Sequence, residues 1–99
     1  MRSKSKPVSV KVTIPVLLGH LTCGVSEIDV PGNTVGDVLN NVVERLPRLR
    51  VILFPSEGHL DEFTYIALNQ RVLTPPDNPL AEKVASGDEV SIIIPLAGG

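Results

Sequence analysis

The spacing of apolar and polar residues changes period along the chain, and each period predicts one kind of element. From Val8 to Ile14, apolar and polar residues alternate until Pro15 ends the pattern, and residues 25–30 alternate again. Alternation of this kind is typical of half-buried strands. The residues between them, 17–24, contain Gly19 and Gly24 and predict a turn. We therefore expect a hairpin of two strands.

The next segment changes to a helical period. Its apolar residues fall three and four positions apart and form one stripe, made of Val35, Val38, Leu39, Val42, Val43 and Leu46. Thr34 is a favourable N-cap residue, and Asp37 stands at the third helical position, where an acid suits both a capping box and the positive end of the helix. Pro47 ends the pattern. These signals predict one main helix between Thr34 and Pro47.

The second half of the chain predicts shorter elements. Residues 48–60 are apolar at first and then contain Pro55 and Gly58, which indicates a short irregular or partly helical stretch followed by a loop. A strand is expected over 63–68, then a turn at 69–71, a short strand at 72–73 and a loop at 74–78. One turn of helix is expected within 79–84. The turn Ser86-Gly87-Asp88 leads into a last strand over 89–94.

This order of elements predicts an α+β fold, with a mixed sheet of four to five strands and the main helix packed on one face. A strand that follows a crossover usually runs parallel to its partner. If the last strand lies centrally beside the first, the arrangement is the ubiquitin-like β-grasp. We expect a disordered basic N-terminal arm over residues 1–7, one folded domain over 8–95 and a flexible tail over 96–99.

Composition limits the classes of function. The chain has 99 residues, of which 42% are hydrophobic and 20% charged, as in a single globular domain. The formal net charge is −2, but three basic residues lie within residues 1–6, so residues 7–99 carry six basic and eleven acidic side chains. An acidic domain with only three aromatic residues argues against binding of nucleic acid. It favours a protein partner with a basic docking surface.

Cys23 is the only cysteine, so neither an intramolecular disulfide nor a cysteine-based metal site can form. The N-terminus lacks the apolar run of a signal peptide, and no apolar run reaches a membrane-spanning length. We therefore expect a cytoplasmic protein that contacts no membrane.

The polar residues predict no catalytic site. His20 and His59 each lie among turn residues and are interpreted as solvated loop histidines. Cys23 has no base near it in sequence and is interpreted as an ordinary small residue. Asp61 and Glu62 are adjacent, so on a strand their side chains point to opposite sides and make a poor acid–base pair. We expect no catalytic residue, no metal ligand and no bound cofactor.

The C-terminal segment carries the most information. Gly98 and Gly99 give an end without side chains, lean enough to enter a narrow channel in another protein. The preceding strand places Ile92, Ile93 and Ile94 on both of its faces. If Val90, Ile92 and Ile94 face the helix, Ile93 faces outward. Its face is then either partly covered by loops or an apolar docking patch beside the tail, and both interpretations stay open.

Three stretches of the chain resemble the ThiS/MoaD family of ubiquitin-like sulfur carriers. The C-terminal run of a Gly87-Asp88 turn, a hydrophobic strand, Pro95, small residues and Gly98-Gly99 is similar to the closing signature of that family. The helix start at 34–39 and Leu68-Asn69 are similar too. The long connection 48–60 resembles carriers of cysteine biosynthesis (the CysO-like branch), whereas Ile94-Pro95 is shared with molybdopterin-type (MoaD-like) carriers.

The resemblance implies a mechanism in which this chain is a carrier and not an enzyme. A partner activating enzyme uses ATP to adenylate the Gly99 carboxylate, and sulfur then replaces AMP to leave a thiocarboxylate. Leu96, Ala97 and Gly98 thread into partner active sites, and Ile93 and Pro95 dock on the partner. A sulfur-accepting synthase receives the sulfur for molybdopterin or cysteine biosynthesis, and the carrier can be the small subunit of such a synthase.

Two other functions remain open from the sequence. The same activated Gly99 suits a ubiquitin-like modifier that is conjugated to lysines, because the chemistry of the tail is shared. A plain structural domain, in which the terminal glycines have no role, is the second alternative.

Overall fold

The computed structural model describes residues 9–56, 59–61, 63–73 and 78–94. Its elements are the strands β1 (Ser9–Thr13), β2 (Glu27–Pro31), β3 (Tyr65–Leu68), β4 (Arg71–Val72) and β5 (Glu89–Ile93), the helices α1 (Gly19–Thr22), α2 (Val35–Arg45) and α3 (Arg50–Leu53), and the 3-10 turns η1 (Val16–Leu18), η2 (Pro47–Leu49) and η3 (Pro79–Ala81). The proposed arm, the tail from 96 and Pro95 lie outside the described residues, so those boundaries stay predictions.

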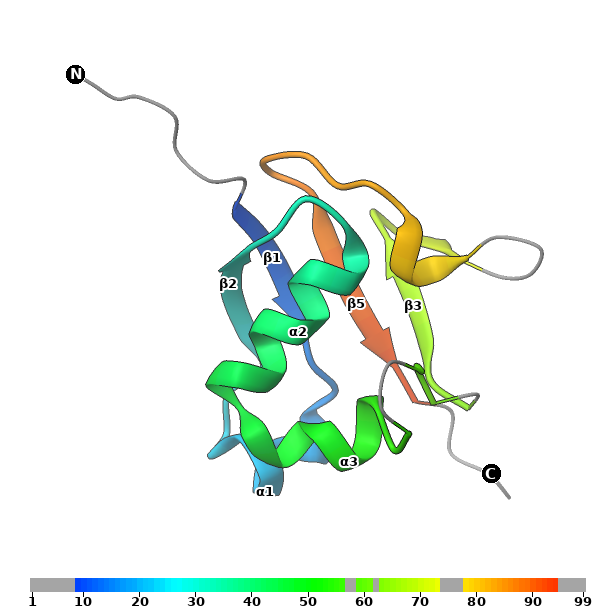
Figure 1. Cartoon of the computed structure of the whole chain (residues 1–99). Helices are drawn as coiled ribbons and strands as arrows, with labels where there is room; N and C mark the ends of the chain where they lie inside the picture. The colour runs from blue at the N-terminus through cyan, green and yellow to red at the C-terminus, as the bar shows by residue number, and fades with distance from the viewer. Residues whose placement is uncertain (1–8, 57–58, 62, 74–77, 95–99) are drawn as a thin grey trace.

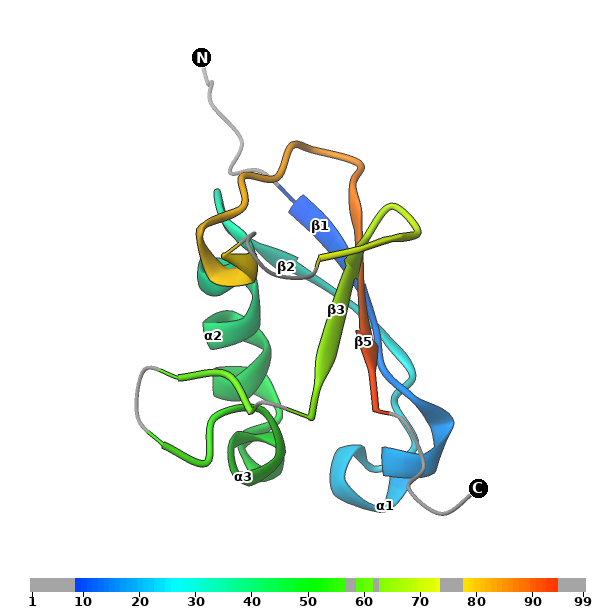
Figure 2. The same ribbon diagram turned by 90° about the vertical axis from the view of Figure 1, so that its right-hand side faces the viewer.

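The strands form one mixed sheet in the order β2-β1-β5-β3-β4. β1 pairs with β2 and β3 pairs with both β4 and β5 in antiparallel fashion, whereas β1 and β5 run parallel. Figure 1 shows α2 crossing one face of this sheet, and the side view in Figure 2 separates the helical layer from the sheet. The predicted α+β fold, the hairpin and the central last strand beside the first are confirmed: the chain has the ubiquitin-like β-grasp fold.

The core lies between α2 and the sheet and is built from aliphatic side chains. The predicted helix stripe supplies Val35, Val38, Leu39, Val42 and Val43, all at most 2% exposed. The sheet supplies Val10, Val12, Val30, Ile66, Leu68, Val90 and Ile92. Because strand side chains alternate between faces, every second residue of β1, β3 and β5 is directed to this core, and the residues between form an outer face.

The ends of α2 follow the expected signals. Thr34 Oγ1 accepts a hydrogen bond from the Asp37 amide at 3.1 Å, and Asp37 Oδ2 accepts one from the Asn33 amide at 3.3 Å. The helix ends at Arg45, just before Pro47. The first bond satisfies an amide group that the first helical turn leaves without a partner, and the second ties the residue before the N-cap to the helix.

Two local predictions differ from the structure. Residues 17–24 are more than a turn, because η1 and α1 occupy most of the segment and Thr22 Oγ1 donates to the Val25 carbonyl at 2.8 Å. His20 therefore lies in α1 and not in a loop. The strand predicted from Phe63 begins at Tyr65, because Asp61 Oδ2 accepts bonds from the Phe63 amide and the Thr64 hydroxyl and holds a turn there. The remaining strand ends differ by one or two residues.

Candidate functional site

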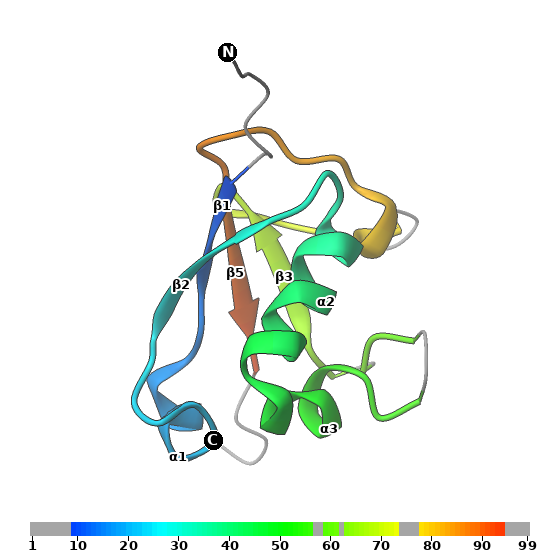
Figure 3. The same ribbon diagram turned by 60° about the vertical axis from the view of Figure 1, so that its left-hand side comes forward.

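The candidate site is the end of the molecule toward which β5 runs. β5 lies at the centre of the sheet, so it has hydrogen-bonded neighbours on both sides, β1 and β3. In Figure 3, β5 runs behind α2 toward the end of the sheet where α1 and α3 lie. Ile94 is the last described residue. The roles predicted for Pro95, Leu96, Ala97, Gly98 and Gly99 fall on residues outside the described part and stay predictions.

The beginning of β5 is fixed by Asn69, the first residue of the β3–β4 turn. The Asn69 amide donates to the Glu89 carbonyl at 2.8 Å, and Asn69 Oδ1 accepts from the Glu89 amide at 2.9 Å. Asn69 Nδ2 also donates to Asp88 Oδ1 at 3.1 Å. Asn69 has a positive φ of 51°, which asparagine tolerates better than most residues. This side chain therefore joins the tight turn to the start of the last strand.

Asp88 adds a second restraint at the same place. Its Oδ2 accepts a hydrogen bond from the Ala85 amide at 2.7 Å and closes the turn before β5. The pKa of Asp88 is lowered from its ordinary value, first by this backbone hydrogen bond and then by the bond from Asn69. The anionic form is thus the one that holds the turn.

The isoleucines of β5 divide between the two faces as expected. Val90 is fully buried and Ile92 is 4% exposed, whereas Ile93 between them and the tail is 37% exposed. Ile94 is partly buried and packs against the core. The predicted register, with Ile93 facing outward, is confirmed; its role in docking is still a prediction.

Ile93 belongs to a small apolar area on the outer face, which we call the outer-face patch: Tyr65, Ala67, Val72 and Ile93. Tyr65 lies directly opposite Ile93, and Val72 lies opposite Ala67. Tyr65 is 42% exposed and Val72 is 44% exposed. Sequence reasoning missed Tyr65 and Val72. The alternation within β3 was the available signal, since Ile66 and Leu68 on the core face require Tyr65 and Ala67 to face outward.

The outer face is polar at the other end of β5. Thr13 Oγ1 donates to Glu89 Oε2 at 2.7 Å, and Lys11 stands opposite Glu89 in the parallel pairing. The apolar part of this face thus lies at the carboxyl end of β5, next to the residues that lead to the tail.

Further exposed apolar side chains lie at the same end. Val16 and Leu17 follow β1, which runs parallel to β5, and are 83% and 55% exposed. Phe63 precedes β3, which runs antiparallel to β5, and is 68% exposed. Both segments must therefore lie near the carboxyl end of β5, and none of these residues was predicted as a contact. Exposed apolar side chains thus lie near the carboxyl end of β5 on the sides of both β1 and β3.

The described side chains that were considered for catalysis do not come together in one common site. Cys23 is exposed and caps α1 with a positive φ of 56°, and the His20 carbonyl accepts a bond from Arg48 Nη1 at 3.3 Å. His59 lies in the distant α3–β3 connection, where its amide donates to the Ser56 carbonyl. Among the described residues there is no group of three His, Cys, Asp or Glu side chains able to hold a metal ion. Within the same residues, no helix has the length and hydropathy needed to cross a membrane.

Comparison with known proteins agrees with this geometry. The model of the ThiS family matches residues 17–99. Among solved structures, SAMP1 from Haloferax volcanii shares 26% identity with a TM-score of 0.78, covering 92% of this chain and 99% of its own. CysO in the Amycolatopsis orientalis BexX/CysO complex shares 28% identity with a TM-score of 0.80, covering 91% and 99%.

A third solved structure is also similar to this chain. A putative molybdopterin converting factor subunit 1 from Pyrococcus furiosus shares 28% identity with a TM-score of 0.66, covering 90% of this chain and 99% of its own. A comparison with curated proteins gave no match. The family model covers far more than half of the residues, including the segment that β5 leads to. On this evidence the chain belongs to the ThiS family.

Proposed function

We propose that this protein is a sulfur carrier whose functional atom is in the terminal carboxyl group of Gly99. The observation that carries the proposal is the ThiS-family match, which extends from the β1–β2 connection through Gly98 and Gly99. The position of β5 supports it. A central strand, held by two neighbours and by Asn69, is a firm base from which the following residues can be presented to another protein.

The proposed reaction takes place in the partners. A Gly99 carboxylate oxygen attacks the α-phosphorus of ATP in an adenylating enzyme, and pyrophosphate leaves. Sulfide, or the terminal sulfur of a persulfide, then attacks the acyl carbon and AMP leaves. With sulfide the product is the thiocarboxylate directly; with a persulfide, a thiol must cleave the acyl disulfide that forms first. The carrier contributes the acyl group and the docking surface, and it is not itself the catalyst.

The outer-face patch is the proposed docking surface for the activating enzyme. Ile93 stands three residues before the predicted tail and Tyr65 lies opposite it in the sheet, so an enzyme that takes Gly99 can contact this patch as well. Burial of apolar side chains there contributes to binding. Pro95, Leu96, Ala97 and Gly98 are proposed to lie in the channel that leads to the active site.

The sulfur acceptor is proposed to be a biosynthetic synthase, for cysteine or for molybdopterin. CysO and the molybdopterin converting factor subunit resemble this chain at the same identity of 28%, and the TM-score is higher for CysO, 0.80 against 0.66. The observation that CysO is solved in complex with BexX supports the existence of a protein partner.

A modifier role is the second candidate, favoured by the likeness to SAMP1, whose name in a related solved structure is small archaeal modifier protein 1. In that case a lysine amine attacks the activated Gly99 acyl carbon and forms an isopeptide bond. Adducts that survive a denaturing gel and carry the Gly-Gly remnant on lysine would identify this function.

Intact-protein mass spectrometry tests the main proposal. The protein, co-expressed with its activating enzyme and supplied with ATP and a sulfur donor, should contain a fraction in which sulfur replaces one oxygen. Deletion of Gly99, or a tag after it, should abolish that fraction, whereas the same tag at the N-terminus should not. If only the unmodified mass appears with the enzyme present and active, the proposal is wrong.

A further inference from the structure

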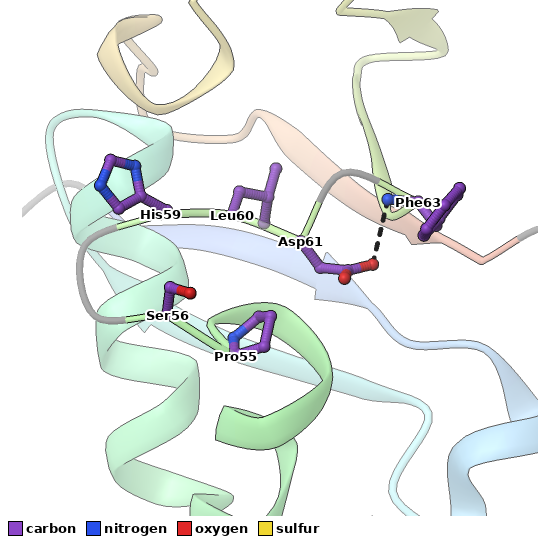
Figure 4. A pocket seen from close by; sticks show the side chains of 6 residues that line it. All are labelled: Pro55, Ser56, His59, Leu60, Asp61 and Phe63. Atoms are coloured by element: carbon purple, nitrogen blue, oxygen red, sulfur yellow. Dashed lines mark hydrogen bonds between the residues drawn. The ribbon is translucent and has the colours of Figure 1, made fainter.

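Residues of the connection between α3 and β3 line an open hollow that has no part in the proposed function. It has a volume of about 280 Å³ and is lined by Pro55, Ser56, His59, Leu60, Asp61 and Phe63 (Figure 4). This is below the range of about 300–1,000 Å³ that is typical of small-molecule sites. A single large side chain of another protein is a better match in size.

The walls of the hollow are held in place by backbone hydrogen bonds. The His59 amide donates to the Ser56 carbonyl at 3.0 Å and brings the two runs of the connection together. The Asp61 amide donates to the Leu53 carbonyl at 2.8 Å, which ties the second run to α3. These two bonds hold the described residues on either side of the hollow.

Asp61 supplies a fixed negative charge. Its Oδ2 accepts both the Phe63 amide and the Thr64 hydroxyl, each at 3.1 Å. Because both bonds go to the same oxygen, Oδ1 accepts no hydrogen bond from the described residues. Figure 4 shows the Asp61 carboxylate beside the ring of Phe63. A carboxylate held in one orientation can receive a donor with little further loss of conformational freedom.

Phe63 supplies a flat apolar surface next to that charge. Its side chain is 68% exposed, the most exposed aromatic residue in the described chain. Leu73, Phe54 and most other large apolar side chains are buried, so this ring is an exception to the pattern of the core. An aromatic face beside a carboxylate is a favourable surface for a planar cation.

The charge of the segment also favours a cation from outside. Residues 55–64 contain three acidic residues and no lysine or arginine. Of the four arginines that the structure describes, Arg45 bonds to the Asp29 carbonyl, Arg48 to the His20 carbonyl and Arg71 to Glu82, whereas Arg50 is an exposed residue of α3 that does not line the hollow.

We propose that this hollow binds an arginine side chain of a protein partner. The guanidinium group donates to Asp61 Oδ1 while its plane stacks on the Phe63 ring. Arginine suits this surface better than lysine, because the guanidinium group is planar and presents several donors in a fixed fork. The occupant is a residue of a protein and not a free ligand.

The position of the hollow indicates which partner supplies the arginine. Phe63 is two residues before Tyr65, and Tyr65 lies opposite Ile93 in the outer-face patch. The hollow lies on the α3 side of the sheet and the patch on the opposite face, so a protein that takes the tail reaches both only by extending around the end of the sheet at Phe63 (Figure 2). The identity of the partner as the activating enzyme rests on the proposed function, whereas the preference for arginine does not.

A titration by NMR tests the preference on the intact, 15N-labelled protein. N-acetyl-arginine amide should shift the amide signals of Ser56, His59, Asp61 and Phe63, and N-acetyl-lysine amide should do so more weakly. Asp61→Asn should weaken arginine binding about fivefold, as expected for one charge pair at a surface. This variant retains an oxygen acceptor for the Phe63 and Thr64 bonds, so the loop is expected to keep its shape.

Glu44→Gln on α2 is the matched control, because it removes one exposed acid that does not line the hollow and should leave the titration unchanged. Equal effects of the two amides, an unchanged affinity of Asp61→Asn, or shifts located elsewhere would each overturn the proposal.

Binding to the activating enzyme separates this proposal from the function. Asp61→Asn should bind that enzyme more weakly than Glu44→Gln does. If the wild-type protein forms no thiocarboxylate, the proposed function fails while the arginine titration still stands. If thiocarboxylate forms and Asp61→Asn binds the enzyme as tightly as the control, the hollow is not part of that interface and the inference about its partner is wrong.

Discussion

Two adjacent isoleucines of β5 should respond in opposite ways to the same substitution. Ile92 is 4% exposed and packs in the core, and Ile93 is 37% exposed on the outer-face patch. They share a strand, a residue type and almost the same distance from the tail. Ile92→Asp and Ile93→Asp therefore form a matched pair that differs mainly in the face on which the charge is placed.

The magnitudes follow from burial. Removal of a core isoleucine side chain costs about 2–5 kcal/mol, and an unpaired buried carboxylate adds several kcal/mol more. That total reaches the whole stability of a small domain, about 5–15 kcal/mol. Ile93→Asp loses a partly exposed contact with Tyr65 and some strand propensity, together about 1–2 kcal/mol. Ile92→Asp should therefore be largely unfolded, whereas Ile93→Asp should stay folded.

Circular dichroism during urea unfolding measures the two stabilities, and a pull-down with the activating enzyme measures docking. Ile93→Asp should keep the far-ultraviolet spectrum of the wild type while binding the enzyme at least tenfold more weakly, because the partner must now bury a charge. A folded Ile92→Asp together with an unfolded Ile93→Asp would show that the register of β5 is displaced by one residue. Unchanged binding by a folded Ile93→Asp would remove the patch from the interface.

Three further substitutions test single features of the fold and the mechanism. Thr34→Ala should lower the free energy of unfolding by about 1 kcal/mol, since the Asp37 amide loses its acceptor; no change in a urea titration would mean that the cap is not formed in solution. Cys23→Ser should form thiocarboxylate as the wild type does, measured by intact mass, because the proposed mechanism places the sulfur on Gly99; loss of the product would transfer the sulfur chemistry to the thiol. Asp88 has a lowered pKa in the folded protein, so its contribution to stability is present above about pH 4 and is lost as the pH falls through the folded-state pKa. Urea titrations at decreasing pH should therefore show a smaller acid loss for Asp88→Asn than for the wild type, and equal losses would contradict this assignment.

Much of the fold was predictable from sequence because local and long-range signals agree. The apolar stripe from Val35 to Val43 has a helical period, Thr34 and Asp37 cap it, and burial of the stripe against the sheet requires the same helix. Alternation in β1 identified its core face without any knowledge of pairing, whereas the outward position of Ile93 in β5 was predicted only on the condition that Val90 and Ile92 face the helix. Element ends were less predictable, because they depend on single bonds such as that between Asp61 and Thr64, which no periodicity reveals.

The candidate site was predictable only in part, for a physical reason. Ile93 was identified because alternation within one strand fixes its face. Tyr65 and Val72 join it only through the pairing of β3 with β5 and β4, and the sequence does not specify that register. The hollow beside Phe63 depends on the closure of an irregular loop by the Ser56 carbonyl and the His59 amide. A single backbone bond of this kind leaves no periodic pattern in the sequence.

The two faces of β5 separate stability from recognition. Val90 and Ile92 contribute to the core, whereas Ser91 and Ile93 contribute almost nothing to it, because side chains of a strand alternate. Substitutions on the outer face can therefore change the partner while the inner face keeps the strand, and with it the path of the chain toward Gly99, in place. A carrier that must fit more than one enzyme needs this arrangement, since its docking surface can be altered without moving the base of the tail. The outer-face patch, and not the core, is then the place where members of one fold that serve different pathways should differ most.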